Sequence, residues 1–110
     1  MSIARIKQHD TKGIFIDVLT VDDVPVNLTG VLGVQFLMKK PGHAINGAAS
    51  VTNVSGGGVS YQPVEADVRY DGHYQQEWEV KFSDGRRLTF PNNAYNTVII
   101  EPDLGGDPPS

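Results

Sequence analysis

Hydrophobic and polar residues alternate most regularly over residues 74–82, beyond the middle of the chain. On one face fall Tyr74, Gln76, Trp78, Val80 and Phe82, and on the other His73, Gln75, Glu77, Glu79 and Lys81. A period of two is typical of a β-strand with one buried face and one face in water. We therefore expect a long, half-buried strand at the centre of the fold.

The segment Asp71-Gly72-His73-Tyr74 directly precedes this strand. It has the form of the corner that leads into a central strand of immunoglobulin-like sandwiches, where a Tyr hydroxyl bonds to upstream backbone. We expect Tyr74 to make that bond. We also expect Gly72 to adopt backbone angles that a Cβ atom disfavours.

Shorter runs with a strand pattern recur along the chain, separated by turn signals. The expected strands are 3–8, 13–20, 32–39, 49–54, 59–61, 88–90 and 97–101, and the expected turns or loops are 22–25, 41–47, 55–58 and 83–86, with one helical turn within 64–70. Many short strands at this spacing predict an all-β fold. We expect an immunoglobulin-like antiparallel β-sandwich, with one domain at 1–102 and a Gly/Pro-rich tail or docking arm at 103–110.

The alternation also predicts which side chains form the core and which face outward. The expected core residues are Ile16, Val34, Phe36, Trp78, Val80 and Phe82. A sandwich buries one face of each sheet, so Phe15, Leu19 and Leu37, on the opposite faces, should point outward or toward a rim. Such a cluster would mark a contact surface. The alternative is that a crossing loop or the N-terminal strand covers it.

The tail, D-L-G-G-D-P-P-S, has too many Gly and Pro residues for a place inside a sheet. It is either a disordered end or an arm that docks on a neighbouring protein. In the second case its contacts include Asp103, Leu104, Pro108 and Pro109, which we add to the predicted partner interface.

Composition excludes several classes of function. The 110 residues include no Cys, so neither disulfides nor thiolate chemistry is expected. The net charge is −4 and the few basic residues are scattered, which argues against nucleic-acid binding. No apolar run has the length of a signal peptide core or a membrane span, so we expect no membrane partner.

Catalytic and metal-binding patterns are also missing from the sequence. His9, His43 and His73 lie in different segments without metal-ligand spacing, and the carboxylates fall in turns. We expect no metal, no cofactor and no enzymatic activity, although a calcium site between two acidic loops stays an alternative. For a sugar-binding surface, Tyr70 and Tyr95 are the exposed aromatic candidates.

A series of short motifs gives the chain a recognisable order. The series contains Val26–Gly30 (V-N-L-T-G), Val34–Lys39, Val59–Tyr61, Asp71–Tyr74, Phe82–Gly85, Thr89–Pro91 and Val98–Glu101. In this order the motifs resemble the N-terminal domain of phage baseplate upper proteins, an immunoglobulin-like module of tailed-phage virions. The resemblance covers about residues 3–104 and implies a structural protein, made in the host cytoplasm and incorporated into the virion.

The resemblance leads to three hypotheses about function. The first is a baseplate or tail assembly module that contacts other virion proteins, as a homo-oligomer or in many copies. Members of that family continue beyond this module whereas the present sequence ends soon after it, which favours a second hypothesis, a capsid decoration protein. The third, from a different class, is a glycan-binding adhesion module.

Overall fold

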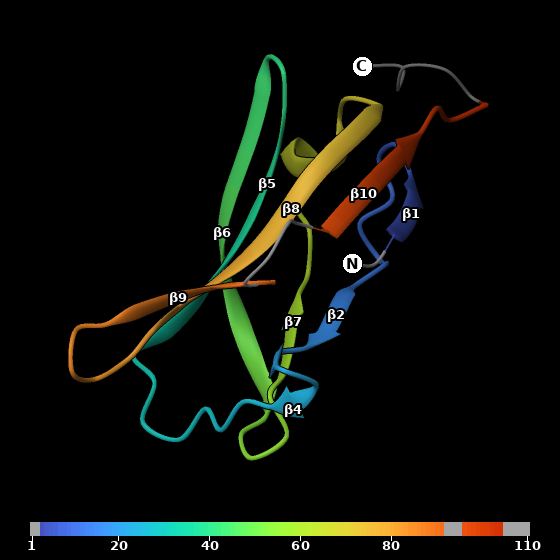
Figure 1. Ribbon diagram of the computed structural model, residues 1–110. Helices are drawn as coiled ribbons and strands as arrows, with labels where there is room; N and C mark the ends of the chain where they lie inside the picture. Colours follow the sequence, from blue (N-terminus) through green and yellow to red (C-terminus); the bar gives the residue numbers. More distant parts are fainter. Residues whose placement is uncertain (1–2, 92–95, 105–110) are drawn as a thin grey trace.

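The computed structural model describes residues 3–91 and 96–104. Its elements in chain order are β1 (Ile3–Lys7), β2 (Phe15–Val18), β3 (Thr20–Val21), β4 (Val24–Pro25), β5 (Gly33–Lys40), β6 (His43–Asn53), β7 (Gly58–Tyr61), the 3₁₀ turn η1 (Glu65–Val68), β8 (Gly72–Lys81), β9 (Arg87–Phe90) and β10 (Asn96–Glu101). The all-β prediction is confirmed (Figure 1).

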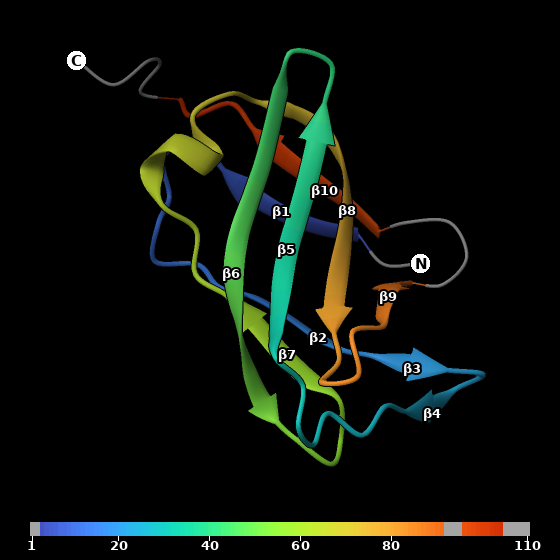
Figure 2. The same ribbon diagram turned by 90° about the vertical axis from the view of Figure 1, so that its left-hand side faces the viewer.

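The main sheet follows the path β1-β10-β8-β5-β6-β7-β2, with β9 paired to β8 and β3–β4 forming a separate hairpin. β1 pairs with β10 in parallel, and the other neighbours are antiparallel. The sheet curls strongly, and in Figure 2 β1 and β10 cross behind β5 and β6. Its two end strands, β1 and β2, line one common cleft, so the sheet is nearly closed. A specifically immunoglobulin-like topology stays a prediction.

The hairpin β5–β6 corrects one predicted loop. A loop was expected at 41–47, but only Pro41 and Gly42 connect the strands, and β6 begins at His43. Gly42 has φ +86°, which a tight connection requires. The predicted strand 49–54 covers the second half of β6; the first half was missed because it is rich in Ala, Asn and Gly, which have weak strand propensity.

Tertiary packing explains why one of these weak residues is needed. Gly47 lies opposite Phe36, and the ring of Tyr61 stacks on Phe36 with centroids 4.4 Å apart. A Cβ atom on Gly47 would lie 2.4 Å from the Tyr61 ring. Glycine at this position therefore makes room for an aromatic side chain from β7.

The core is formed around an aromatic cluster. Phe36 is stacked between Phe15 and Tyr61, and the edge of Trp78 meets its ring at a centroid distance of 5.2 Å. Of the residues expected in the core, Val34, Phe36, Trp78 and Val80 are buried, and Phe82 is half-buried against them. Phe82 is less covered because it follows the last residue of β8, at the start of the turn to β9.

The predicted facing of β2 is wrong. Phe15 and Leu19, expected outside, are buried, whereas Ile16, expected in the core, is 73% exposed. The inward face of β2 carries Asp17 between them, and the Oδ2 atom of Asp17 accepts a hydrogen bond from the Trp78 indole at 3.1 Å. A buried indole N–H needs an acceptor, so the polar residue faces inward and three aliphatic residues face water.

The corner before β8 has the predicted geometry. The Tyr74 hydroxyl donates to the carbonyl of Tyr70 at 2.7 Å, and Gly72 has φ +141°. Burial raises the pKa of Tyr74 to about 12, with a smaller contribution from the Asp71 carboxylate. The hydroxyl therefore stays protonated and remains a donor at neutral pH.

Candidate interaction surfaces

The cleft between the two end strands has a polar floor. Asp17 of β2 accepts from Trp78 and, through the same Oδ2 atom, from the amide of Asn96 at 3.2 Å. Asn96 also donates to Oε1 of Gln76 at 2.9 Å. Gln76 and Asn96 are buried, and Asp17 is half-buried. Among the described strands β2 does not pair with β8 or β10, which pair with each other, and these side chains join it to both across the interior.

The walls of this cleft come from both end strands. It has a volume of about 230 Å³ and is lined by residues 4–6 of β1 and by residues 13–17. Beside it, the outward face of the β2 segment presents Ile14, Ile16 and Val18, each more than half exposed. An exposed row of β-branched apolar residues on an edge strand is a feature of contact surfaces.

Sequence reasoning placed the contact surface on this segment but on the wrong face. It missed Ile14, Ile16 and Val18, and the signal that identifies them is Asp17. The Asp17 carboxylate lies on the same face of the strand as Phe15 and Leu19. That face can be buried only if a hydrogen-bond donor from another element reaches the carboxylate. The indole of Trp78, mid-way along the central strand, is that donor.

Leu37, the third residue of the predicted interface, lies elsewhere. It is half-buried on the outer face of β5 and lines a shallow depression of about 480 Å³ together with Ile45, Gln75 and Glu77. Phe15, Leu19 and Leu37 therefore do not form one patch. The depression is a second surface, on the side of the sheet opposite the core.

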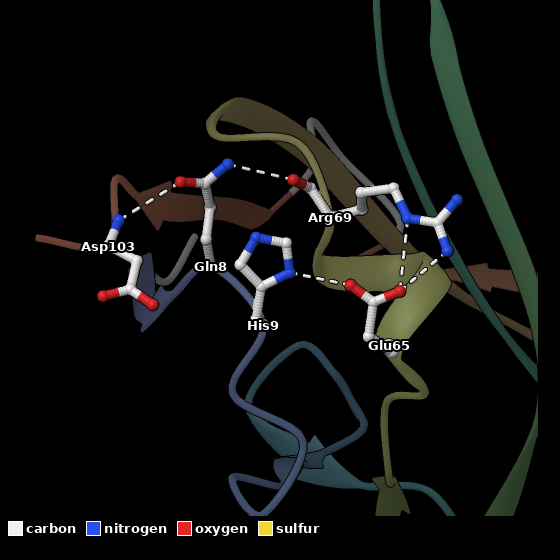
Figure 3. A network of polar contacts seen from close by, with 5 residues as sticks. All are labelled: Gln8, His9, Glu65, Arg69 and Asp103. Carbon is white, nitrogen blue, oxygen red and sulfur yellow. Dashed lines mark hydrogen bonds and ion pairs between the residues drawn. The ribbon is translucent and has the colours of Figure 1, made fainter. Parts of the chain in front are cut away.

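A polar network holds the end of the molecule where β1 ends and the chain leaves β10 (Figure 3). Gln8 donates through Nε2 to the carbonyl of Arg69 at 2.9 Å and accepts at Oε1 from the N–H of Asp103 at 3.2 Å. Leu104, the next residue, is fully exposed. Asp103 is thus fixed by its backbone and Leu104 projects into solvent, whereas Pro108 and Pro109 lie outside the described residues.

The second half of the network connects the loop after β1 to η1. The Nδ1 atom of His9 lies 2.7 Å from Oε2 of Glu65, and Arg69 donates to Oε1 of Glu65 at 2.7 Å. Hydrogen bonds from Arg69, and then from His9, lower the pKa of Glu65. Glu65 therefore carries its charge at neutral pH and holds two elements that are far apart in sequence.

The aromatic candidates for sugar binding are described in part. Tyr70 is half exposed, and its ring lies edge-on to the ring of His43 at a centroid distance of 4.9 Å. Tyr95 lies outside the described residues, so a platform formed by both rings stays a prediction.

Within residues 3–91 and 96–104, no three His, Asp or Glu side chains gather closely enough to hold a metal ion. In the same ranges, no helix has the length and apolar character needed to cross a membrane.

Comparison with solved structures identifies a protein of similar fold. The fold is similar to that of the N-terminal domain of phage TP901-1 ORF48, with a TM-score of 0.67 and 13% sequence identity. The similarity covers 91% of this chain and 85% of that chain. No family model matches the chain, and no curated protein sequence matches it. At this identity the similarity establishes a common fold.

Proposed function

We propose that the protein is a structural component of a tailed-bacteriophage virion, an immunoglobulin-like module of the baseplate or tail. The observation that carries this proposal is the fold, which is shared over nearly the whole chain with a domain of a phage protein. The order of motifs that resembles baseplate upper proteins gives independent support, because it was identified from the sequence alone.

The surfaces support a role in binding other proteins. An exposed aliphatic row on β2 and a shallow depression on β5, β6 and β8 offer contact areas on different sides of the sheet. The side-chain networks at Asp17 and Glu65 consist of groups that bond one another and hold separate segments of the chain together. In this proposal the module acts without catalysis and without a cofactor, through contacts with other virion proteins in a multi-copy assembly.

The test is to locate the protein in purified particles of the phage or prophage that encodes it. Quantitative mass spectrometry of the particles gives the copy number, and gold-labelled antibody in the electron microscope gives the position. We expect label at the distal end of the tail and between a handful and a few dozen copies. Hundreds of copies with label on the head would favour capsid decoration, and absence from the particles would contradict a structural role.

A glycan array on the isolated domain separates the third hypothesis. The half-exposed Tyr70 beside His43 is the described aromatic site that a sugar ring could stack on. Specific binding that is lost in Tyr70→Ala but kept in Leu88→Ala, a change at another exposed site, would favour an adhesion module over an assembly module.

A further inference from the structure

We propose that the cleft between β1 and β2 binds an extended segment of another protein as an added strand, which completes the nearly closed sheet. The segment places a basic side chain over Asp17. This inference deepens the proposed function, and it rests on that function only for the identity of the chain that supplies the strand.

The first observation is the free edge of β2. In an antiparallel pair, alternate residues direct their backbone groups to the partner strand. The N–H of Leu19 donates to the carbonyl of Gly57 at 2.8 Å, in continuation of the β2–β7 register. Phe15 and Asp17 therefore bond to β7, and Ile16 and Val18 direct their N–H and C=O groups toward the cleft. The N–H of Val18 is already bonded to Oδ1 of Asp17. In the described part of the chain, Ile16 is therefore the β2 residue whose N–H and C=O groups both lack a hydrogen-bond partner.

The second observation is a matching free edge on β1. The N–H of Gln8 donates to the carbonyl of Glu101 at 2.8 Å, in line with the β1–β10 pairing. By the same alternation Ala4 and Ile6 bond to β10, and Arg5 directs its backbone groups toward the cleft. Among the described residues no strand pairs with either of these two edges, and both border one cleft of about 230 Å³. A single extended segment can bond to both edges, which is the mode of strand addition.

The third observation concerns what the segment must carry. Asp17 faces the cleft, and among the described residues no Lys, Arg or His forms an ion pair with it. A Lys or Arg on the inward face of the segment would neutralise this half-buried carboxylate. On the outward face, β-branched residues would continue the row formed by Ile14, Ile16 and Val18. The occupant is therefore a segment with a basic residue between two apolar ones.

The two edges differ in a way that favours this occupant over a second copy of the whole domain. Charged side chains protect the outer face of β1, where Arg5 and Lys7 are exposed, whereas β2 has only aliphatic residues there. The edge strand of a second folded domain cannot enter the cleft, because the rest of that domain would collide with β1 on the other side. A terminal extension or a long loop fits the space.

The experiment is a titration of the full chain with the acetylated and amidated synthetic peptide Thr-Ser-Val-Lys-Val-Ser-Thr, followed by NMR. The chain has one Trp, so a single indole N–H signal reports on the floor of the cleft. We expect shifts confined to that signal and to residues 4–6 and 14–17. We also expect the amide of Ile16 to exchange with solvent on the order of tenfold more slowly in the complex.

Three protein variants and one control peptide make the result specific. Ile16→Pro removes the outward N–H on an edge where Pro is tolerated, and should abolish binding. Ile16→Thr retains the N–H and should still bind. The peptide with Glu in place of Lys should bind more weakly, and Asp17→Asn should reduce that difference. Before titration, the dispersed NMR spectrum of each variant shows whether it is folded.

Three results would overturn the inference. One is an unchanged Ile16 amide at about millimolar peptide, which is the affinity range of weak complexes. Another is equal binding of the Lys and Glu peptides. The last is self-association through residues 14–17 in the absence of peptide, which would assign the edge to a second copy. All three are measured on the isolated chain, so they are independent of whether the protein is found in virions.

Discussion

At the scale of single residues, Asp17 determines how β2 lies on the core. Its two carboxylate oxygens bond three groups, the N–H of Val18, the indole of Trp78 and the amide of Asn96. Buried polar groups without partners cost free energy, whereas a charged acceptor with several donors is well stabilised. This one side chain therefore fixes which face of β2 is inside, and it connects three strands of the sheet.

The role of Asp17 predicts different stabilities for two substitutions. Asp17→Ala leaves the indole N–H of Trp78 without an acceptor, and should lower the free energy of unfolding by about 1–3 kcal/mol. Asp17→Asn keeps an acceptor oxygen in the same place and should cost less. Urea unfolding followed by Trp78 fluorescence measures both. Equal losses for the two variants would show that the hydrogen bond to the indole contributes little.

At the scale of elements, β2 and η1 show how segments far apart in sequence are held. β2 is a four-residue strand at one end of the sheet, packed through Phe15 on the ring of Phe36. η1 is connected to the loop after β1 through Glu65, and to β7 through Asp67, which accepts from the Tyr61 hydroxyl at 2.6 Å. Burial, and then the bond to Asp67, raises the pKa of Tyr61 above its usual value.

The facing of β2 is tested by a matched pair of substitutions on adjacent residues. Phe15→Ala removes a buried ring from the aromatic cluster and should cost about 3–5 kcal/mol. Ile16→Ala removes an exposed side chain and should change the stability by no more than about 0.5 kcal/mol. Thermal or urea unfolding distinguishes them. The reverse order of effects would restore the facing expected from the alternation.

The connection of η1 to the loop after β1 predicts a pH dependence. The pKa of Glu65 is lowered from its usual value of 4.5 in the folded chain, so the unfolded state binds a proton first as the pH falls. The stability that Glu65 contributes is therefore fully present above pH 4.5 and is lost as the pH falls through the folded pKa. Melting curves of the wild type and Glu65→Gln should differ at pH 7 and converge in acid. A difference that persists at the lowest pH would contradict the charge interaction.

At the scale of the whole molecule, the central strands and the end strands differ in how they are bonded. β5 and β8 have a neighbour on both sides and include the buried Phe36 and Trp78, whereas β1 and β2 each pair on one side in the described part of the sheet. Local openings need the least free energy where few contacts and ladder bonds must break. Stability should therefore decrease from the centre of the sheet toward its two ends.

Amide hydrogen exchange on the free protein measures this gradient. We expect the slowest exchange at Phe36 and Trp78 and much faster exchange at Ile16, whose N–H faces the cleft. The backbone of Asp17, which bonds to β7, serves as a neighbouring comparison on the same strand. If Ile16 were as protected as Phe36, the two end strands would be joined and the sheet closed.

The elements that could be predicted from the sequence are those whose signals are local. The alternation through Val80 gave the central strand, Gly72 and Tyr74 gave the corner, and Asp84-Gly85 gave the β8–β9 turn, where Gly85 has φ +89°. Each signal depends on the residues within one element, because strand faces and turn angles follow from neighbouring side chains.

Tertiary structure alone decided the features that depend on distant partners. The facing of β2 follows from a bond between Asp17 and Trp78, 61 positions apart, and the first half of β6 forms because β5 pairs with it over Gly47. The cleft exists because β1 pairs in parallel with β10, while within residues 3–91 and 96–104 no strand pairs with its other edge, which lies beside β2. These are pairings between segments, and the period of hydrophobic residues within one segment carries no information about its partner.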